Sequence, residues 1–117
     1  MLEVRYERGA TSLEVVDLAR ARSLAINARA LEHYFRGDGV AAAHLWEQAM
    51  VADASYGDPI YNLACLHART GDLARAADEL ALALALDPLH YARLARSDPD
   101  LEDLREDEEV RRWIGLR

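Results

Sequence analysis

The chain has 117 residues, among them 14 arginines, no lysine and 21 aspartates or glutamates, which leaves a formal charge of -7 at pH 7. This negative charge opposes binding to a phosphate backbone, so nucleic acid is not an expected partner. Alanine and leucine are the most frequent residue types and only 7% of the chain is aromatic, a composition that favours an all-α fold over a β-sheet.

Seven helices are predicted in chain order. The first starts at Thr11-Ser12-Leu13-Glu14, which matches a capping box. Gly37-Asp38 and Gly71-Asp72 are predicted turns, because glycine adopts the left-handed conformation that ends a helix and the following aspartate can cap the next one. The predicted helices cover residues 12–36, 39–53, 58–70, 73–86, 89–96, 99–105 and 108–114.

Three Asp-Pro pairs separate the later helices. Asp58-Pro59 and Asp98-Pro99 each match a helix cap followed by proline at the first helical position, whereas Asp87-Pro88 prevents the preceding helix from continuing. The run from Leu80 to Leu86 alternates leucine and alanine as a strand would. A helix is nevertheless expected there, because both residues are strong helix formers.

An internal repeat with a period of about 34 residues organises the chain, and a fixed period of this length is typical of helical repeat proteins. One shift superposes Ile26 on Ile60, Ala30 on Ala64, His33 on His67, Gly37-Asp38 on Gly71-Asp72, Ala42 on Ala76, Trp46 on Leu80, Ala49 on Ala83 and Asp53 on Asp87. The alanines fall where two helices of one unit would cross closely, since a larger side chain would push them apart. We therefore expect one domain over residues 1–117, with an N-terminal segment (1–22), two helix-turn-helix repeats (23–56 and 57–90) and a C-terminal cap (91–117).

The second unit resembles a tetratricopeptide repeat (TPR), because nearly every signature position of that family is filled between Ile60 and Pro88. The first unit is similar, but Arg29 stands where the family has a buried leucine and Ala54 where it has proline. The stretch from Tyr91 to Trp113 is similar to the closing segment of many bacterial members. The resemblance implies a right-handed stack of antiparallel helix pairs with short C-terminal capping helices. Its concave face would hold a peptide or helix of another protein, and it would have no catalytic apparatus.

A candidate binding groove follows from the helical spacing of the first helix in each unit. Its residues are Asn27, Leu31, Tyr34, Phe35, Tyr61, Cys65 and Arg69. The apolar and aromatic members suit an apolar segment of a partner, and the arginine suits a carboxylate. The alternative is that the N-terminal helix folds back and covers this stripe as ordinary core. A carboxylate clamp of the chaperone-binding type is not expected, because Asn27 and Leu31 replace its lysine and asparagine.

No metal, cofactor or catalytic site is predicted. His33, His44, Cys65 and His67 lack the close spacing of zinc ligands. The acidic stretch 98–109 resembles a calcium loop only in the positions of its acids, because Asp103 replaces the required glycine, so a solvated face is expected. The sequence contains no glycine-rich phosphate loop, nucleophile elbow or Cys-x-x-Cys pair.

The expected function is that of a non-catalytic adaptor which binds a peptide or helix of a partner protein. The alternative is a structural protein that forms a homodimer through the repeat face, because two units are fewer than the roughly three that a comfortable core requires. Cytoplasmic localisation is expected, since MLEVRYERGA lacks the apolar stretch of a secretory signal and Cys65 has no partner for an intramolecular disulfide. No apolar run approaches the roughly 18 to 20 residues that span a bilayer, so no membrane partner is expected.

Overall fold

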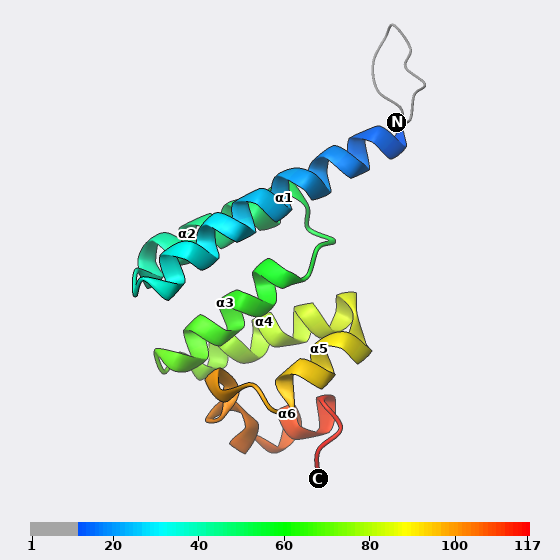
Figure 1. Cartoon of the computed structure of the whole chain (residues 1–117). Helices are drawn as coiled ribbons and strands as arrows, with labels where there is room; N and C mark the ends of the chain where they lie inside the picture. Colours follow the sequence, from blue (N-terminus) through cyan, green and yellow to red (C-terminus); the bar gives the residue numbers. More distant parts are fainter. Residues whose placement is uncertain (1–11) are drawn as a thin grey trace, which may run out of the picture.

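The computed structural model describes the backbone of residues 12–117 and the side chains from Leu18 onward, and this part of the chain is all-helical, without a strand (Figure 1). The sequence-based expectation of an all-α protein is thus confirmed. Part of the predicted capping box at 11–14, and the segment 1–10, lie outside the described residues. The helices are α1 (Ser12–Phe35), α2 (Gly39–Ala52), α3 (Asp58–Arg69), α4 (Leu73–Leu86), α5 (Pro88–Ala95) and α6 (Glu108–Trp113), with 3-10 turns η1 (Pro99–Leu101) and η2 (Leu104–Glu106).

The two Gly-Asp pairs form the same turn in both helical hairpins. Gly37 and Gly71 have φ values of +85° and +90°, a region that L side chains avoid. The Asp38 carboxylate accepts from the Ala41 N–H at 3.1 Å, and that of Asp72 accepts from the Arg75 N–H at 3.3 Å. Both aspartates therefore cap the following helix, as predicted.

Asp58 does not have the predicted capping role. Helix α3 begins at Asp58 itself, and Gly57 occupies the N-cap position without a side-chain hydrogen bond. The Asp58 carboxylate instead accepts from the hydroxyls of Tyr56 at 2.8 Å and Tyr91 at 2.6 Å. A Cβ atom at Gly57 would lie 2.6 Å from the Tyr91 ring, so the absence of a side chain there lets the tyrosine reach the carboxylate.

The segment predicted as one short helix over 99–105 consists of two separate 3-10 turns. Asp98 caps the first through a 3.0 Å bond from the Asp100 N–H. Leu101 and Leu104 are both almost completely buried. Their spacing of three residues is compatible with either kind of helix, and the break at residues 102–103 places them in separate turns.

Close packing of the two hairpins depends on alanine. Ala30, Ala42, Ala64 and Ala76 have no exposed surface, as expected for positions where paired helices cross. Helices α1 and α2 pack along one another, α3 packs on α4, and α2 joins the two pairs by packing on α3. Within residues 12–117 no helix combines the length and the apolar character needed to cross a bilayer.

The outward surface of α1 differs in chemistry from the same surface of α3. Leu63 and Leu66 of α3 are buried in the core that α3 shares with α1 and α2. The residues at the equivalent positions of the first unit are Arg29 and Glu32, and both are exposed on α1. Charged residues thus stand where α3 has its contact residues, which explains why Arg29 occupies a position at which a buried leucine would be expected.

Candidate functional site

Three of the seven predicted groove residues are buried, not open to a partner. Asn27 is 7% exposed, and Tyr61 and Cys65 are each 5% exposed. The Asn27 Oδ1 accepts from the Trp46 indole N–H at 2.8 Å and from the Asn62 amide at 3.1 Å. Asn27 therefore ties α1 to α2 and α3, and its predicted place on an open surface is corrected.

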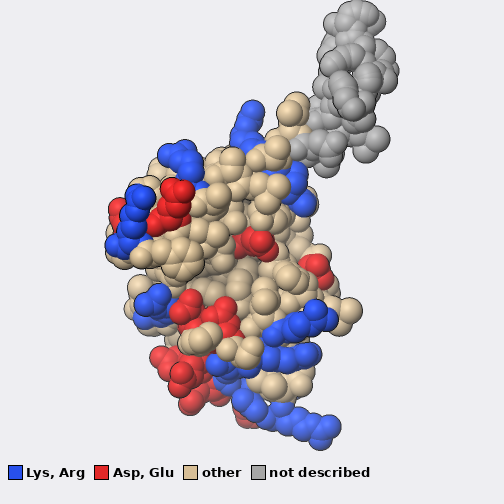
Figure 2. All heavy atoms as spheres, in the orientation of Figure 1, with Lys and Arg blue, Asp and Glu red and all other residues tan. Residues whose placement is uncertain are grey.

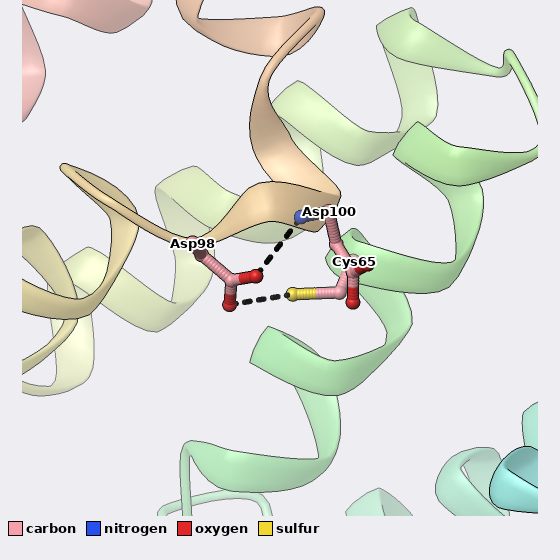
Figure 3. Close-up of side chains that lie close together, drawn as sticks. All are labelled: Cys65, Asp98 and Asp100. Atoms are coloured by element: carbon pink, nitrogen blue, oxygen red, sulfur yellow. Dashed lines mark hydrogen bonds between the residues drawn. The ribbon is translucent and has the colours of Figure 1, made fainter.

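The inner face of α3 is closed by the chain's own C-terminal segment. The Asp98 Oδ2 accepts from the Tyr61 hydroxyl at 2.8 Å and from the Cys65 thiol at 3.6 Å. Figure 3 shows the carboxylate of Asp98, just before η1, lying directly against the Cys65 side chain. The Tyr61 ring also stacks on that of Tyr91, with centroids 5.4 Å apart. The predicted alternative, coverage by the N-terminal helix, is therefore wrong for α3, because residues near 98 provide the cover.

Tyr34 lies at the centre of a second, more exposed cluster. Its hydroxyl donates to Asp100 Oδ2 at 3.1 Å and accepts from Arg69 Nη1 at 2.6 Å. The Arg69 Nε is 3.5 Å from Asp100 Oδ1, and the Tyr34 ring packs against Trp46 at a centroid distance of 5.5 Å. The cluster joins α1, α3 and η1, and a hollow of about 260 Å³ opens beside it, with Tyr34 and Arg69 in its lining.

Burial raises the pKa of the thiol and of the two phenols on this face. It raises the pKa of the Cys65 thiol above the usual 9.0, and the negative charges of Asp98 and Asp100 raise it further. Burial is also the largest cause of the raised pKa of Tyr61 and of Tyr34. These groups are therefore protonated hydrogen-bond donors at neutral pH, which is what the neighbouring carboxylates require.

The atoms of Cys65, Asp98 and Asp100 that could bind a cation lie within 4.8 Å of one another. Their hydrogen bonds fit a different role. Both oxygens of Asp98 accept protein donors, because the Asp100 N–H occupies the second one. The arrangement is therefore suited to fastening the C-terminal segment onto α3.

Comparison with protein-family models, curated proteins and solved structures gives no significant match.

Of the predicted groove residues, Phe35 on α1 and Arg69 on α3 are exposed, and the apolar part of this open surface lies on α1. Phe35 is 79% exposed and Leu24 is 46% exposed, while Leu31 is partly buried. With Ala28 they form a line along the helix at spacings of four, three and four residues. We call Leu24, Ala28, Leu31 and Phe35 the α1 apolar stripe. Figure 2 shows this side of α1 as a tan band with blue arginine side chains along its upper edge.

The two equivalent histidines take structural positions. His67 Nδ1 is 2.7 Å from Glu79 Oε1, and both side chains are largely buried between α3 and α4. His33 is more exposed and lies 3.7 Å from Asp38.

Sequence reasoning missed Asp98 and Asp100 as neighbours of the predicted groove. The sequence indicates Asp98 and Asp100 only as acids of a calcium-like loop and as part of the C-terminal cap. One local signal was available, because Asp98-Pro99 was correctly expected to start a helical turn and thus to redirect the chain. The position of this turn against α3 depends on the contacts of Asp98 with Tyr61 and Cys65. These contacts join distant parts of the sequence, so no local pattern predicts them.

Proposed function

We propose that this chain is a non-catalytic, TPR-like module of two helical hairpins with a C-terminal cap, and that it binds a helix or peptide of another protein along the inner face of α1. The two hairpins support the TPR-like assignment because they share the Gly-Asp turns and the fully buried alanines at equivalent repeat positions. The expected closing role of residues 91–117 also accords with the burial of Leu101, Leu104, Val110 and Ile114.

The exposure of the α1 apolar stripe carries the functional proposal. The chain covers the inner face of α3 with its own segment around Asp98, but leaves Leu24 and Phe35 largely in contact with solvent. A line of large apolar side chains on one helix face is a typical helix-docking surface. The binding surface is therefore narrower than the predicted groove and is centred on α1, with Tyr34 and Arg69 at one end.

The alternative, a homodimer formed by stacking the first hairpin on a second copy, has less support. Such stacking would use the positions at which α3 presents Leu63 and Leu66 to its neighbour. In the first hairpin these positions are the exposed, charged Arg29 and Glu32. Polar outer faces are what terminal units of repeat stacks use to stay soluble, so the first hairpin has the character of an end unit.

Affinity capture from the source cells tests the proposal. The stripe variant Leu24→Glu with Phe35→Glu is compared with Val40→Glu with Val51→Glu, which alters two apolar residues of α2 that are 86% and 88% exposed. We expect a partner that is retained by the wild type and the α2 control and at least tenfold less by the stripe variant, since apolar anchors contribute about 2 kcal/mol or more each.

Titration with the purified partner then shows whether the contact is direct, and thermal melting verifies that every variant is folded. Undiminished capture by a folded stripe variant would place the binding surface elsewhere and refute the proposal.

A further inference from the structure

A row of arginines runs beside the α1 apolar stripe. Arg22 and Arg29 lie in α1 and Arg36 directly follows its last residue; the spacing of seven places them on one line, and all three are exposed. Among the described side chains, no ion pair involves any of them. We call these residues the arginine row. In a chain with a net charge of -7, this face is locally basic, with Glu32 as its acidic neighbour.

Small side chains separate the arginine row from the stripe. Ala21 and Ala25 occupy the intervening helix surface next to Ala28 of the stripe, and all three are exposed; the exposed Glu32 lies on the same strip. Alanine lets another helix approach closely. A helix lying over the alanines would contact large apolar side chains along one edge and guanidinium groups along the other. Figure 2 shows blue side chains above a tan band on the front of the molecule, with red acidic atoms among them at the left.

We infer that the segment of the partner protein that binds α1 is an acidic amphipathic helix. This inference rests on the function proposed above. Its apolar residues, at spacings of three and four, pack on the α1 apolar stripe. Its glutamates or aspartates, at intervals of about seven residues, pair with the arginine row, as flanking charges do in coiled coils. Arginine suits this role because its planar guanidinium binds carboxylates in a bidentate manner.

The same charges argue against a second copy of this chain as the occupant. Two antiparallel copies of α1 related by a twofold axis near Ala28 would place Arg29 beside its own equivalent and Arg22 beside Arg36 of the other copy. Like charges at such positions repel each other, and this repulsion disfavours the antiparallel dimer. The charge pattern thus selects a partner with the opposite charge.

Two designed peptides test the inference by fluorescence anisotropy. Both are labelled amphipathic helices of about three heptads with leucine at the a and d positions. One carries glutamate and the other lysine at the flanking positions. We expect the wild-type chain to bind the glutamate peptide at least tenfold more tightly, and the difference to shrink in about 1 M salt, where charges are screened beyond about 3 Å.

Matched variants identify the residues responsible. Arg22→Glu with Arg29→Glu and Arg36→Glu should invert the preference, so that the lysine peptide binds more tightly. Leu24→Ala with Phe35→Ala should weaken binding of the glutamate peptide at least tenfold. The control Arg93→Glu with Arg112→Glu removes two exposed arginines outside α1 and should leave the preference unchanged.

The results separate this inference from the proposed function. Equal binding of the two peptides, a preference for lysine, or no binding at about 1 mM peptide overturns the acidic-helix inference. If capture from cells still depends on Leu24 and Phe35, the proposed function stands and only the chemistry of the partner is wrong. A wild-type dimer in sedimentation that dissociates in the Phe35 variant would instead identify a second copy as the occupant.

Discussion

Tyrosine hydroxyls donate to aspartates at four places in this chain, and all of these pairs except Tyr56–Asp58 join residues at least 33 positions apart. The pairs are Tyr56 and Tyr91 with Asp58, Tyr61 with Asp98, and Tyr34 with Asp100. A phenol donates only while it is protonated, and a carboxylate next to it disfavours the loss of that proton. Burial, together with the carboxylate of Asp58, accordingly raises the pKa of Tyr56 to about 12.

This arrangement predicts a loss of stability at alkaline pH. Cys65 and the tyrosines have pKa values raised above their ordinary 9.0 and 10.0 in the folded chain, so the unfolded chain releases these protons first. The contribution of these protons to the free energy of unfolding should be constant below about pH 9. The free energy of unfolding should fall as the pH rises above that value. Urea denaturation between about pH 7 and 11 measures the fall.

Cys65→Ala provides the control for that prediction. Without the thiol, the decline should begin nearer to pH 10, the ordinary pKa of the tyrosines. A stability that is flat to about pH 11 in the wild-type chain would contradict the protonated hydrogen-bond arrangement.

The glycine of the second turn adopts a backbone conformation that L side chains rarely adopt. Gly71 has a φ of +90°, and a Cβ atom there would have no neighbour within 4 Å. Gly71→Val should therefore destabilise the fold by about 1 to 3 kcal/mol through backbone strain alone. Gly71→Asn should cost less, since asparagine tolerates the left-handed region. Equal stability of the valine variant and the wild type in thermal melts would contradict this account of the turn.

At the scale of elements, the C-terminal segment is part of the core. Leu101, Leu104, Val110 and Ile114 are each 3% exposed or less and share a cluster with Leu80 of α4. The basic residue Arg105 stabilises the bend before η1 by donating to the Ala95 and Asp98 carbonyls at 2.8 and 2.7 Å. Trp113, by contrast, remains 39% exposed.

Removal of residues 98–117 should therefore destabilise the second hairpin. The truncation uncovers Tyr61 and Cys65 on α3 and the apolar flank of α4, and contiguous apolar surface promotes aggregation. We expect aggregates in size-exclusion chromatography and faster reaction of Cys65 with a thiol reagent. The variant Glu102→Gln with Glu106→Gln, which alters exposed residues of the same segment, should behave like the wild type. A soluble truncation with an unreactive Cys65 would show that the segment is not part of the core.

At the scale of the whole molecule, the outward surface of α1 carries the exposed Arg29 and Glu32 at the positions where α3 has the buried Leu63 and Leu66. Arg29→Leu with Glu32→Leu would give the first hairpin the contact residues that α3 uses as Leu63 and Leu66. We expect this variant to self-associate in sedimentation velocity, because two exposed leucines extend the apolar surface of α1. Arg93→Leu with Glu102→Leu is the matched control and should leave the sedimentation coefficient unchanged. If the α1 double-leucine variant sediments like the wild type, the charges of Arg29 and Glu32 do not control self-association of this surface.

The amino-acid sequence by itself determined the helices, the turns and the buried alanines. These features depend on local rules: the left-handed conformation of Gly37 and Gly71, the capping aspartates after them, and side chains small enough for close helix crossing. The internal repeat placed the alanines of both hairpins correctly. The wrong prediction of one helix over 99–105 also depends on a local rule. In so short a segment, the spacing of Leu101 and Leu104 fits an α-helix and a 3-10 helix equally well.

Only the tertiary structure decided which groove residues are open. The contacts that bury Cys65 and fasten Tyr34 join residues 33 and 66 positions apart, to Asp98 and Asp100 respectively. The periodicity identifies the face of a helix that a residue occupies, but the path of a distant segment determines what covers that face. Tyr61 and Cys65 are therefore core because the C-terminal segment lies over them, and Asn27 is core because it bonds to α2 and α3, whereas Phe35 and Arg69 remain exposed.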